Sequence, residues 1–232
     1  MEFGLGHASL CPSYPASGFE TASSDLVATA SRTHRIVGRD LQIINEVSMR
    51  IAIDPPTVTA NFAKLKDNKA FQESAQLFAR GLPVLEMLQA MSMNERVLHA
   101  FAAFETIYPG GSLERGVLEK VILRVSQLHE CQFCINSHLD IMRSFDIAVD
   151  LQDASRLSDR EAAAIAYAEA VTRDANRINE EVFDRIKANY TEAEIVELTF
   201  LIGLITLLNR FNNALRVRYR GELSGKIAGT GM

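Results

Sequence analysis

The sequence is poor in cysteine and proline, and it contains no long uninterrupted apolar run. Three cysteines among 232 residues are too few for the disulfide framework of a small secreted protein. The longest apolar stretch, residues 198–208, is interrupted by Thr199, Gly203 and Thr206 and falls short of the roughly 20 residues that span a bilayer. Residues 1–10 lack the basic start and apolar block of an export signal. We therefore expect a cytoplasmic protein that does not enter the membrane.

The chain also lacks an excess of positive charge. Its net charge is -5 at pH 7, whereas a nucleic-acid-binding protein needs clustered lysine and arginine to neutralise phosphates. The small basic cluster of Arg216, Arg218 and Arg220 is interpreted as a solvated chain end. Nucleic acid is therefore not an expected partner. Apolar residues make up 47% of the chain, which is enough for a sizeable core.

Strand patterns are missing as well. Glycine and proline cluster at breaks such as residues 54–56, 81–83 and 109–111, and no alternating run of β-branched residues is bounded by turns. Helical spacing is clear in residues 113–128, and a second helix is expected over residues 131–145. The sequence therefore predicts an all-α fold.

Several helix starts carry their own signals. Asp54 before Pro55 fits an N-cap followed by proline in the first turn. Residues 158–161 and 191–194 have the spacing of capping boxes. The second box opens the most apolar helix, residues 195–208, which is apolar on every side. We expect that helix to be buried, either at the centre of the fold or in a subunit interface.

Composition divides the chain into three parts. Residues 1–22 are rich in glycine, proline and serine and predict a poorly ordered N-terminal extension, in which Cys11 is a bystander. Residues 23–220 predict a single helical domain. Residues 221–232 predict a flexible tail.

The most informative segment places two cysteines and a histidine on one side of a helix. Cys131, Cys134 and His138 are three and four residues apart, so they lie within about 60° of one another around a helix axis. A thiolate is the reactive form of cysteine, and a helix start near Glu130 would stabilise it through free N–H groups. His138, one turn further on, can relay a proton or stabilise the thiolate as an imidazolium. A close cysteine pair in a cytosolic protein indicates redox chemistry or metal binding.

Glu119 extends this segment to a longer pattern. Glu119, eleven intervening residues, Cys131-x-x-Cys134, three residues and His138 resemble the core motif of the carboxymuconolactone decarboxylase and alkylhydroperoxidase D superfamily. The resemblance covers residues 104–215, including the Pro-Gly break before the glutamate helix and both capped helices. It places the chain in the branch of peroxidase-related proteins that carry the CxxC pair.

The resemblance implies an all-helical protein that assembles as a homotrimer or homohexamer. It also implies an antioxidant, peroxidase-like oxidoreductase that uses neither a cofactor nor a metal. Glu119 would serve as base through His138, Cys134 would attack a hydroperoxide or a small disulfide, and Cys131 would resolve the intermediate as a Cys131–Cys134 disulfide. The resemblance implies a dihydrolipoyl-type dithiol as the reductant and a peroxiredoxin as a partner.

Two positions depart from that picture. Gln132 stands where the best-known relatives have a second histidine between the cysteines, which predicts weaker or altered peroxidase activity. His129 lies two residues before Cys131, but it points in another direction on the helix. Glu119 falls about 60° outside the apolar stripe, so by itself it is typical of a solvated surface residue. If it is catalytic, another helix or a neighbouring subunit must cover it.

Three other readings remain open. Two cysteines and a histidine on one helix face, with Glu119, could form a four-coordinate zinc site. A decarboxylase-type lyase belongs to the same superfamily, although it does not need the cysteine pair. A non-catalytic helical oligomer with an inactive site is the third.

Four polar residues follow the most apolar helix and are interpreted as hydrogen bonding at a helix end: Asn209, Arg210, Asn212 and Asn213.

Overall fold

A computed structural model describes residues 48–65, 67–68, 71, 76–82, 84–106, 108, 111–149, 151 and 156–224. All of them belong to one compact unit, residues 46–232. The regular structure of the described residues is helical and includes no strand, so the all-α prediction is confirmed. The predicted extension of residues 1–22, with Cys11, and residues 225–232 of the predicted tail lie outside the described residues.

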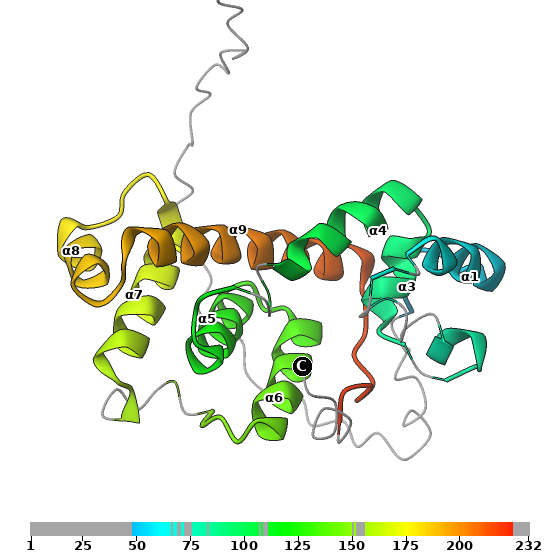
Figure 1. Ribbon diagram of the computed structural model, residues 1–232, viewed down its shortest axis with the longest axis horizontal. Coiled ribbons are helices and arrows are strands. Elements are labelled where there is room, and N and C mark those ends of the chain that lie inside the picture. Colours follow the sequence, from blue (N-terminus) through cyan, green and yellow to red (C-terminus); the bar gives the residue numbers. More distant parts are fainter. Residues whose placement is uncertain are drawn as a thin grey trace, which may run out of the picture. The chain divides into compact units, whose positions relative to one another are not determined.

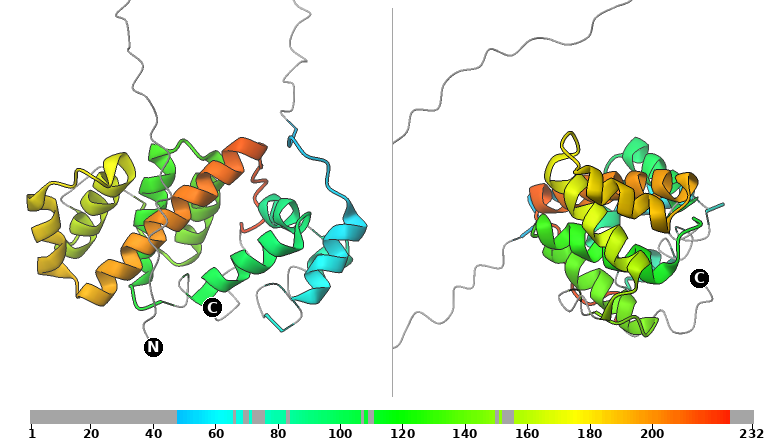
Figure 2. Two further views of the ribbon diagram at one scale, coloured as in Figure 1. Left: turned by 90° about the horizontal axis from the view of Figure 1, so that it is seen from above. Right: turned by 90° about the vertical axis from the view of Figure 1, so that its left-hand side faces the viewer.

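The helices pack around a long C-terminal helix (Figure 1). In chain order they are α1 (Pro55–Lys64), α3 (Glu86–Ser92), α4 (Glu95–Ala102), the 3-10 helix η1 (Ala103–Thr106), α5 (Arg115–Leu128), α6 (Gln132–Ser144), α7 (Asp159–Asp174), α8 (Glu180–Asn189) and α9 (Glu192–Leu215). Helix α5 packs against α6, α7 and α9, and α7 also packs against α8. Figure 2 shows α9 from a second direction, with α7 and α8 toward its N-terminal end. In the described residues, no helix is long and apolar enough to cross a membrane.

Three helix starts form as predicted. The Asp54 carboxylate caps α1 by accepting the backbone N–H of Thr57 at 3.0 Å. Ser158 and Thr191 each form a complete capping box, with Glu161 and Glu194 at the third helical position. Because these side chains satisfy backbone donors that the helix itself leaves free, the helix boundaries are fixed locally.

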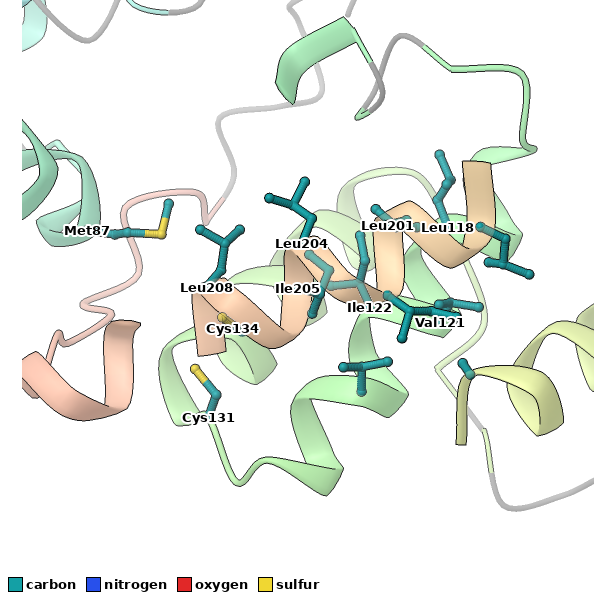
Figure 3. Packing of buried hydrophobic residues seen from close by; sticks show 14 of the residues in the cluster. Met87, Leu118, Val121, Ile122, Cys131, Cys134, Leu201, Leu204, Ile205 and Leu208 are labelled. Carbon is teal, nitrogen blue, oxygen red and sulfur yellow. The ribbon is translucent and has the colours of Figure 1, made fainter. Parts of the chain in front are cut away.

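The core lies between α5, α7 and α9. Figure 3 shows part of it, with apolar side chains of α5 and α9 packed against each other. The labelled members from these two helices are Leu118, Val121, Ile122, Leu201, Leu204, Ile205 and Leu208. The expected burial of α9, at the centre of the fold or in a subunit interface, holds within this chain for part of its surface. Val196, Phe200 and Leu207 are 69%, 47% and 54% exposed.

The segment after α9 returns to the body of the molecule. Arg216 ends the helix in the left-handed conformation, with φ 56°. Arg218 then pairs with the buried Glu86 of α3 at 2.9 Å, so the interpretation of this basic cluster as a solvated end is wrong for Arg218. The Tyr219 hydroxyl donates to Asp140 of α6 at 2.6 Å. These contacts tie α3 and α6 to the C-terminal segment.

Candidate active site

The site begins at the tight junction between α5 and α6. Glu130 has a left-handed backbone, with φ 53°. Its N–H donates to the carbonyl of Gln127 at 3.1 Å, and the N–H of Cys131 donates to the carbonyl of Ser126 at 3.0 Å. These two bonds form a Schellman motif, which ends one helix and satisfies its last carbonyls. Since the next helix starts at Gln132, the junction places Cys131 at the N-cap of α6.

Both cysteines are therefore in the first turn of α6, as predicted. Their thiols are free and buried, with exposed fractions of 0% for Cys131 and 5% for Cys134. Exposure therefore does not distinguish the two thiols. Figure 3 shows the two side chains directed toward each other beside α9. Gln132, between them, is exposed to solvent.

The two thiols have different acidities. A hydrogen bond from the Cys134 thiol, helped by backbone N–H groups of Phe133 and Cys134, lowers the pKa of Cys131 despite its burial. The same hydrogen bond, burial and the charge on Cys131 raise the pKa of Cys134. In a pair of this kind the first proton is lost from the dithiol as a unit. The remaining negative charge is best placed on Cys131, at the helix start.

Helix α9 contributes an amide that the sequence analysis placed only in a general polar group. Asn212 Nδ2 lies 3.3 Å from the Cys134 sulfur and 3.5 Å from the Met87 sulfur. Asn212 is 1% exposed, and its Oδ1 has no hydrogen-bond partner. It is therefore a donor directed at the thiol pair. The next polar residue on the same face, Asn209, accepts a hydrogen bond from Ser126 of α5 at 3.2 Å.

Glu119 and His138 form the second half of the site. Glu119 Oε2 lies 2.7 Å from His138 Nδ1, and the Glu119 side chain is fully buried while that of His138 is 13% exposed. Glu119 is therefore not the solvated residue that its place on the helical wheel alone would indicate, and other helices cover it, as its expected role requires. Helix α5 is covered on several sides, by α6, α7 and α9, so a position outside its main apolar stripe is still inside the protein.

Two further residues complete the surroundings of Glu119. The Tyr108 hydroxyl donates to Glu119 Oε1 at 2.7 Å, and the Tyr108 ring lies 5.8 Å from the His138 ring. Arg115 Nη1 lies 3.6 Å from the same oxygen, and its guanidinium covers the Phe145 ring at 4.3 Å. Sequence reasoning missed both. Arg115 lies one turn before Glu119 and could have been found from that spacing, whereas Tyr108 carries no such signal.

His129 does not replace the histidine that is absent between the cysteines. Its Nε2 lies 3.3 Å from Thr206 Oγ1 of α9. Burial, followed by the nearby charge of Arg210, lowers the pKa of His129. The ring therefore serves the contact between the α5 terminus and α9.

Two other features bear on the alternatives. No group of three or more His, Cys, Asp or Glu side chains among the described residues is arranged to hold a metal ion, and His138 Nδ1 is directed at Glu119. A hollow of about 530 Å³ lies near α1, with Pro55, Phe78 and Val84 in its lining, and none of the dithiol site residues lines it. The described residues thus provide no ligand geometry for the zinc alternative.

Comparisons with known proteins find similar sequences and similar folds. No family model matches the chain. The uncharacterized protein YdfG of Bacillus subtilis (strain 168) is 28% identical over 112 residues, which are 45% of this chain and 76% of that protein. The uncharacterized protein YnjA of Escherichia coli (strain K12) is 28% identical over 121 residues, 47% of this chain and 64% of that one. These relatives carry no assigned activity.

Solved structures decide the fold. An uncharacterized peroxidase-related protein from Silicibacter sp. TM1040 superposes with a TM-score of 0.60 over 76% of this chain and 94% of its own, at 18% identity. The alkylhydroperoxidase AhpD core of a peroxidase-related protein from Ralstonia eutropha JMP134 gives 0.59 over 75% and 94%, also at 18% identity. The chain has the AhpD-like fold. The resemblance inferred from the motif is thus confirmed at the level of the fold.

The AhpD-like fold does not carry a single named activity. The debrominase Bmp8 superposes with a TM-score of 0.54 over 76% of this chain and 93% of its own, at 20% identity. Identities in this range establish a shared fold, whereas function depends on the site. The activity of this protein must therefore be argued from its own residues.

Proposed function

We propose that this AhpD-like protein is a thiol-dependent oxidoreductase that reduces hydroperoxides or small disulfides with the Cys131–Cys134 dithiol. The observation that carries the proposal is the pair of buried thiols in the first turn of α6, with the Asn212 amide 3.3 Å from the Cys134 sulfur. A pair of this kind provides one thiolate to attack and one thiol to follow. Proton transfer is supplied by Glu119, on the neighbouring helix α5, and by His138, on the same helix as the cysteines.

The proposed reaction has three steps. The thiolate attacks a peroxide oxygen, the O–O bond breaks, and the alcohol leaves after taking a proton from the His138 imidazolium, which gives a sulfenic acid. The second thiol then displaces the hydroxyl from that sulfur, so that the S–O bond breaks, water leaves and the Cys131–Cys134 disulfide forms. An external dithiol returns two electrons and two protons by thiol–disulfide exchange. A dihydrolipoyl-type dithiol would be the reductant in this last step, and a peroxiredoxin is proposed as a protein partner.

The order of the two cysteines differs from the one that the motif implies. The motif assigns the attack to Cys134, whereas the local electrostatics favour Cys131. Cys131 is at the N-cap of α6, where the N–H groups of the first turn favour a negative charge, while Cys134 holds its proton more tightly. Cys131 is therefore proposed as the attacking thiolate and Cys134 as the resolving thiol.

Assembly with further copies of the chain is also proposed. Val196, Phe200 and Leu207 recur at three- to four-residue intervals or multiples of them along the exposed side of α9. An apolar stripe of this kind is typical of a helix face that packs against a partner. A homotrimer or homohexamer would cover it, and sedimentation of the wild type against Phe200→Glu tests this arrangement. A monomeric wild type would contradict it.

Consumption of cumene hydroperoxide with dihydrolipoamide as reductant tests the activity. The full-length wild type is compared with Cys131→Ser, Cys134→Ser and the control Cys11→Ser. We expect both site variants to lose turnover and the control to retain it. After one equivalent of peroxide, trapping of sulfenic acid in Cys134→Ser but not in Cys131→Ser would support the proposed order.

The same variants distinguish the alternatives. Equal peroxide consumption in all four proteins would contradict a role for the dithiol. Absence of a Cys131–Cys134 disulfide after mild peroxide would favour the non-catalytic oligomer. Carbon dioxide release from a lactone acid that persists in both cysteine variants would favour the lyase.

A further inference from the structure

Tyr108 lies outside the motif and reaches the site from the loop after η1. Its hydroxyl donates to the fully buried Glu119 at 2.7 Å, and its ring meets the His138 ring edge-on, at an interplanar angle of 63°. Burial and the adjacent carboxylate raise the pKa of Tyr108, so the phenol keeps its proton and remains a donor. Tyr108 therefore contacts both members of the Glu119–His138 pair.

The hydrogen bonds around Glu119 determine what each oxygen can do. Oε2 accepts from His138 Nδ1, and Oε1 accepts from Tyr108. An ionised carboxylate is only an acceptor, so the proton on the imidazole belongs on Nδ1 and Nε2 is left with its lone pair. Among the described residues, Tyr108 is the nearest donor to Oε1. Arg115 Nη1 lies further away, at 3.6 Å, and the Arg115 guanidinium stacks on the Phe145 ring.

We propose that Tyr108 is a positioning residue that keeps Glu119 as an acceptor, so that His138 Nε2, rather than Glu119, takes up the thiol proton. This inference rests on the thiol chemistry proposed above. Glu119 then orients the imidazole and stabilises the imidazolium, as the carboxylate does in a nucleophile–base–carboxylate triad. Without the hydroxyl, the Glu119 carboxylate has more negative charge available for His138.

The charged groups near this pair are few. Among the described residues, the ion pairs of Glu119 are with Arg115 on its own helix and His138 on α6. The next residue, Lys120, is turned to Glu161 of α7 and is paired there. Cys131 and Cys134 lie near the start of α6, the helix that also carries His138. Tyr108 is therefore the neutral donor whose removal changes the pair without removing a charge.

The test compares Y108F with Y167F in the full-length chain. Tyr167 is also buried, and its hydroxyl contacts Thr199 Oγ1 at 2.8 Å on the α7–α9 side of the core. NMR of the His138 ring nitrogens follows protonation as a function of pH. We expect the midpoint to rise by about one pH unit in Y108F, because a hydrogen bond to a charged group is lost. It should be unchanged in Y167F.

Several outcomes would overturn the proposal. An unchanged midpoint in Y108F, or an equal shift in Y167F, would reduce Tyr108 to a packing residue. If Y108F does not fold, the wild type still decides, because a proton on Nε2 rather than Nδ1 of His138 contradicts the geometry. The NMR titration needs no turnover, so it stands even if peroxide forms no disulfide. If peroxide does, the acid limb of its pH–rate profile should move upward in Y108F by the same amount.

Discussion

Two buried glutamates in this protein differ in the chemistry of their hydrogen-bond partners. Glu86 at the start of α3 is 8% exposed and accepts the Arg218 backbone N–H at 2.7 Å and its Nη2 at 2.9 Å, with Arg220 Nη2 at 3.8 Å. Glu119 on α5 is fully buried and is held by Tyr108 and His138. Arginine does not lose its proton in proteins, whereas an imidazole does so near neutral pH.

The difference separates a structural carboxylate from a chemical one. Glu86 offsets a permanent cation and secures the C-terminal segment, so its charge has no reason to change. Glu119 is joined to a group that can gain and lose a proton, and the other nitrogen of that group remains available. Burial alone does not mark a functional carboxylate; a partner that can exchange protons does.

The largest effect is expected from Glu119→Gln. The amide keeps the side-chain shape but removes the charge that orients His138 and stabilises its imidazolium. We expect disulfide formation after one equivalent of peroxide to slow by about 100-fold or more, which is the usual contribution of general acid–base catalysis. Stopped-flow mixing followed by thiol counting measures it. If Glu86→Gln slowed the reaction equally, the comparison of the two carboxylates would fail.

The converse experiment concerns stability. Glu86→Gln weakens the charge-assisted hydrogen bonds to Arg218, which is partly exposed and can be rehydrated. We expect the free energy of unfolding to fall by about 2 kcal/mol, the scale of a hydrogen bond to a charged group. Urea denaturation measures this change. The rate of disulfide formation should stay close to that of the wild type, and a large loss of rate with unchanged stability would reverse the two roles.

A smaller effect is expected from the amide that faces the thiols. The Asn212 donor helps to lower the pKa of Cys131, so Asn212→Ala should raise that pKa. The pH profile of iodoacetamide labelling, read by mass spectrometry, should move upward by about half a unit. Asn213→Ala is the matched control, because Asn213 is exposed and its amide donates to the His129 carbonyl. Labelling of Cys134 before Cys131 would contradict the assignment of the thiolate.

Features set by neighbouring residues could be predicted from the sequence. The helix expected over residues 113–128 is observed as Arg115–Leu128, and the one expected over residues 131–145 as Gln132–Ser144. Both capping boxes form as their spacing indicates. Hydrogen bonds in these elements join residues three to five positions apart, so the information is local. The shared face of Cys131 and Cys134 follows from the same periodicity.

Contacts set by tertiary packing could not be predicted in this way. Asn212 meets Cys134 across 78 positions of the chain, and Arg218 meets Glu86 across 132. The burial of Glu119 depends on how many helices surround α5, which a single helical wheel does not contain. Tyr108 is only 11 positions from Glu119, yet it lies outside α5, so helix periodicity does not relate the two residues.

The smallest effect is expected from Glu194, a carboxylate whose capping contact could be predicted from the local sequence. Glu194 closes the capping box of α9 and accepts from Arg160, and the Thr191 backbone N–H followed by the Arg160 side chain lowers its pKa to about 2. A folded-state pKa below the ordinary 4.5 adds stability at higher pH, and that stability is lost as the pH falls from about 4.5 towards 2. The melting temperature of Glu194→Gln, measured by calorimetry, should therefore change less with pH over this window than that of the wild type. Because Glu194, like Glu86, is held by permanent donors, its replacement should leave peroxide-driven disulfide formation at pH 7 unchanged. A changed rate would show that a carboxylate held by permanent donors also influences the dithiol.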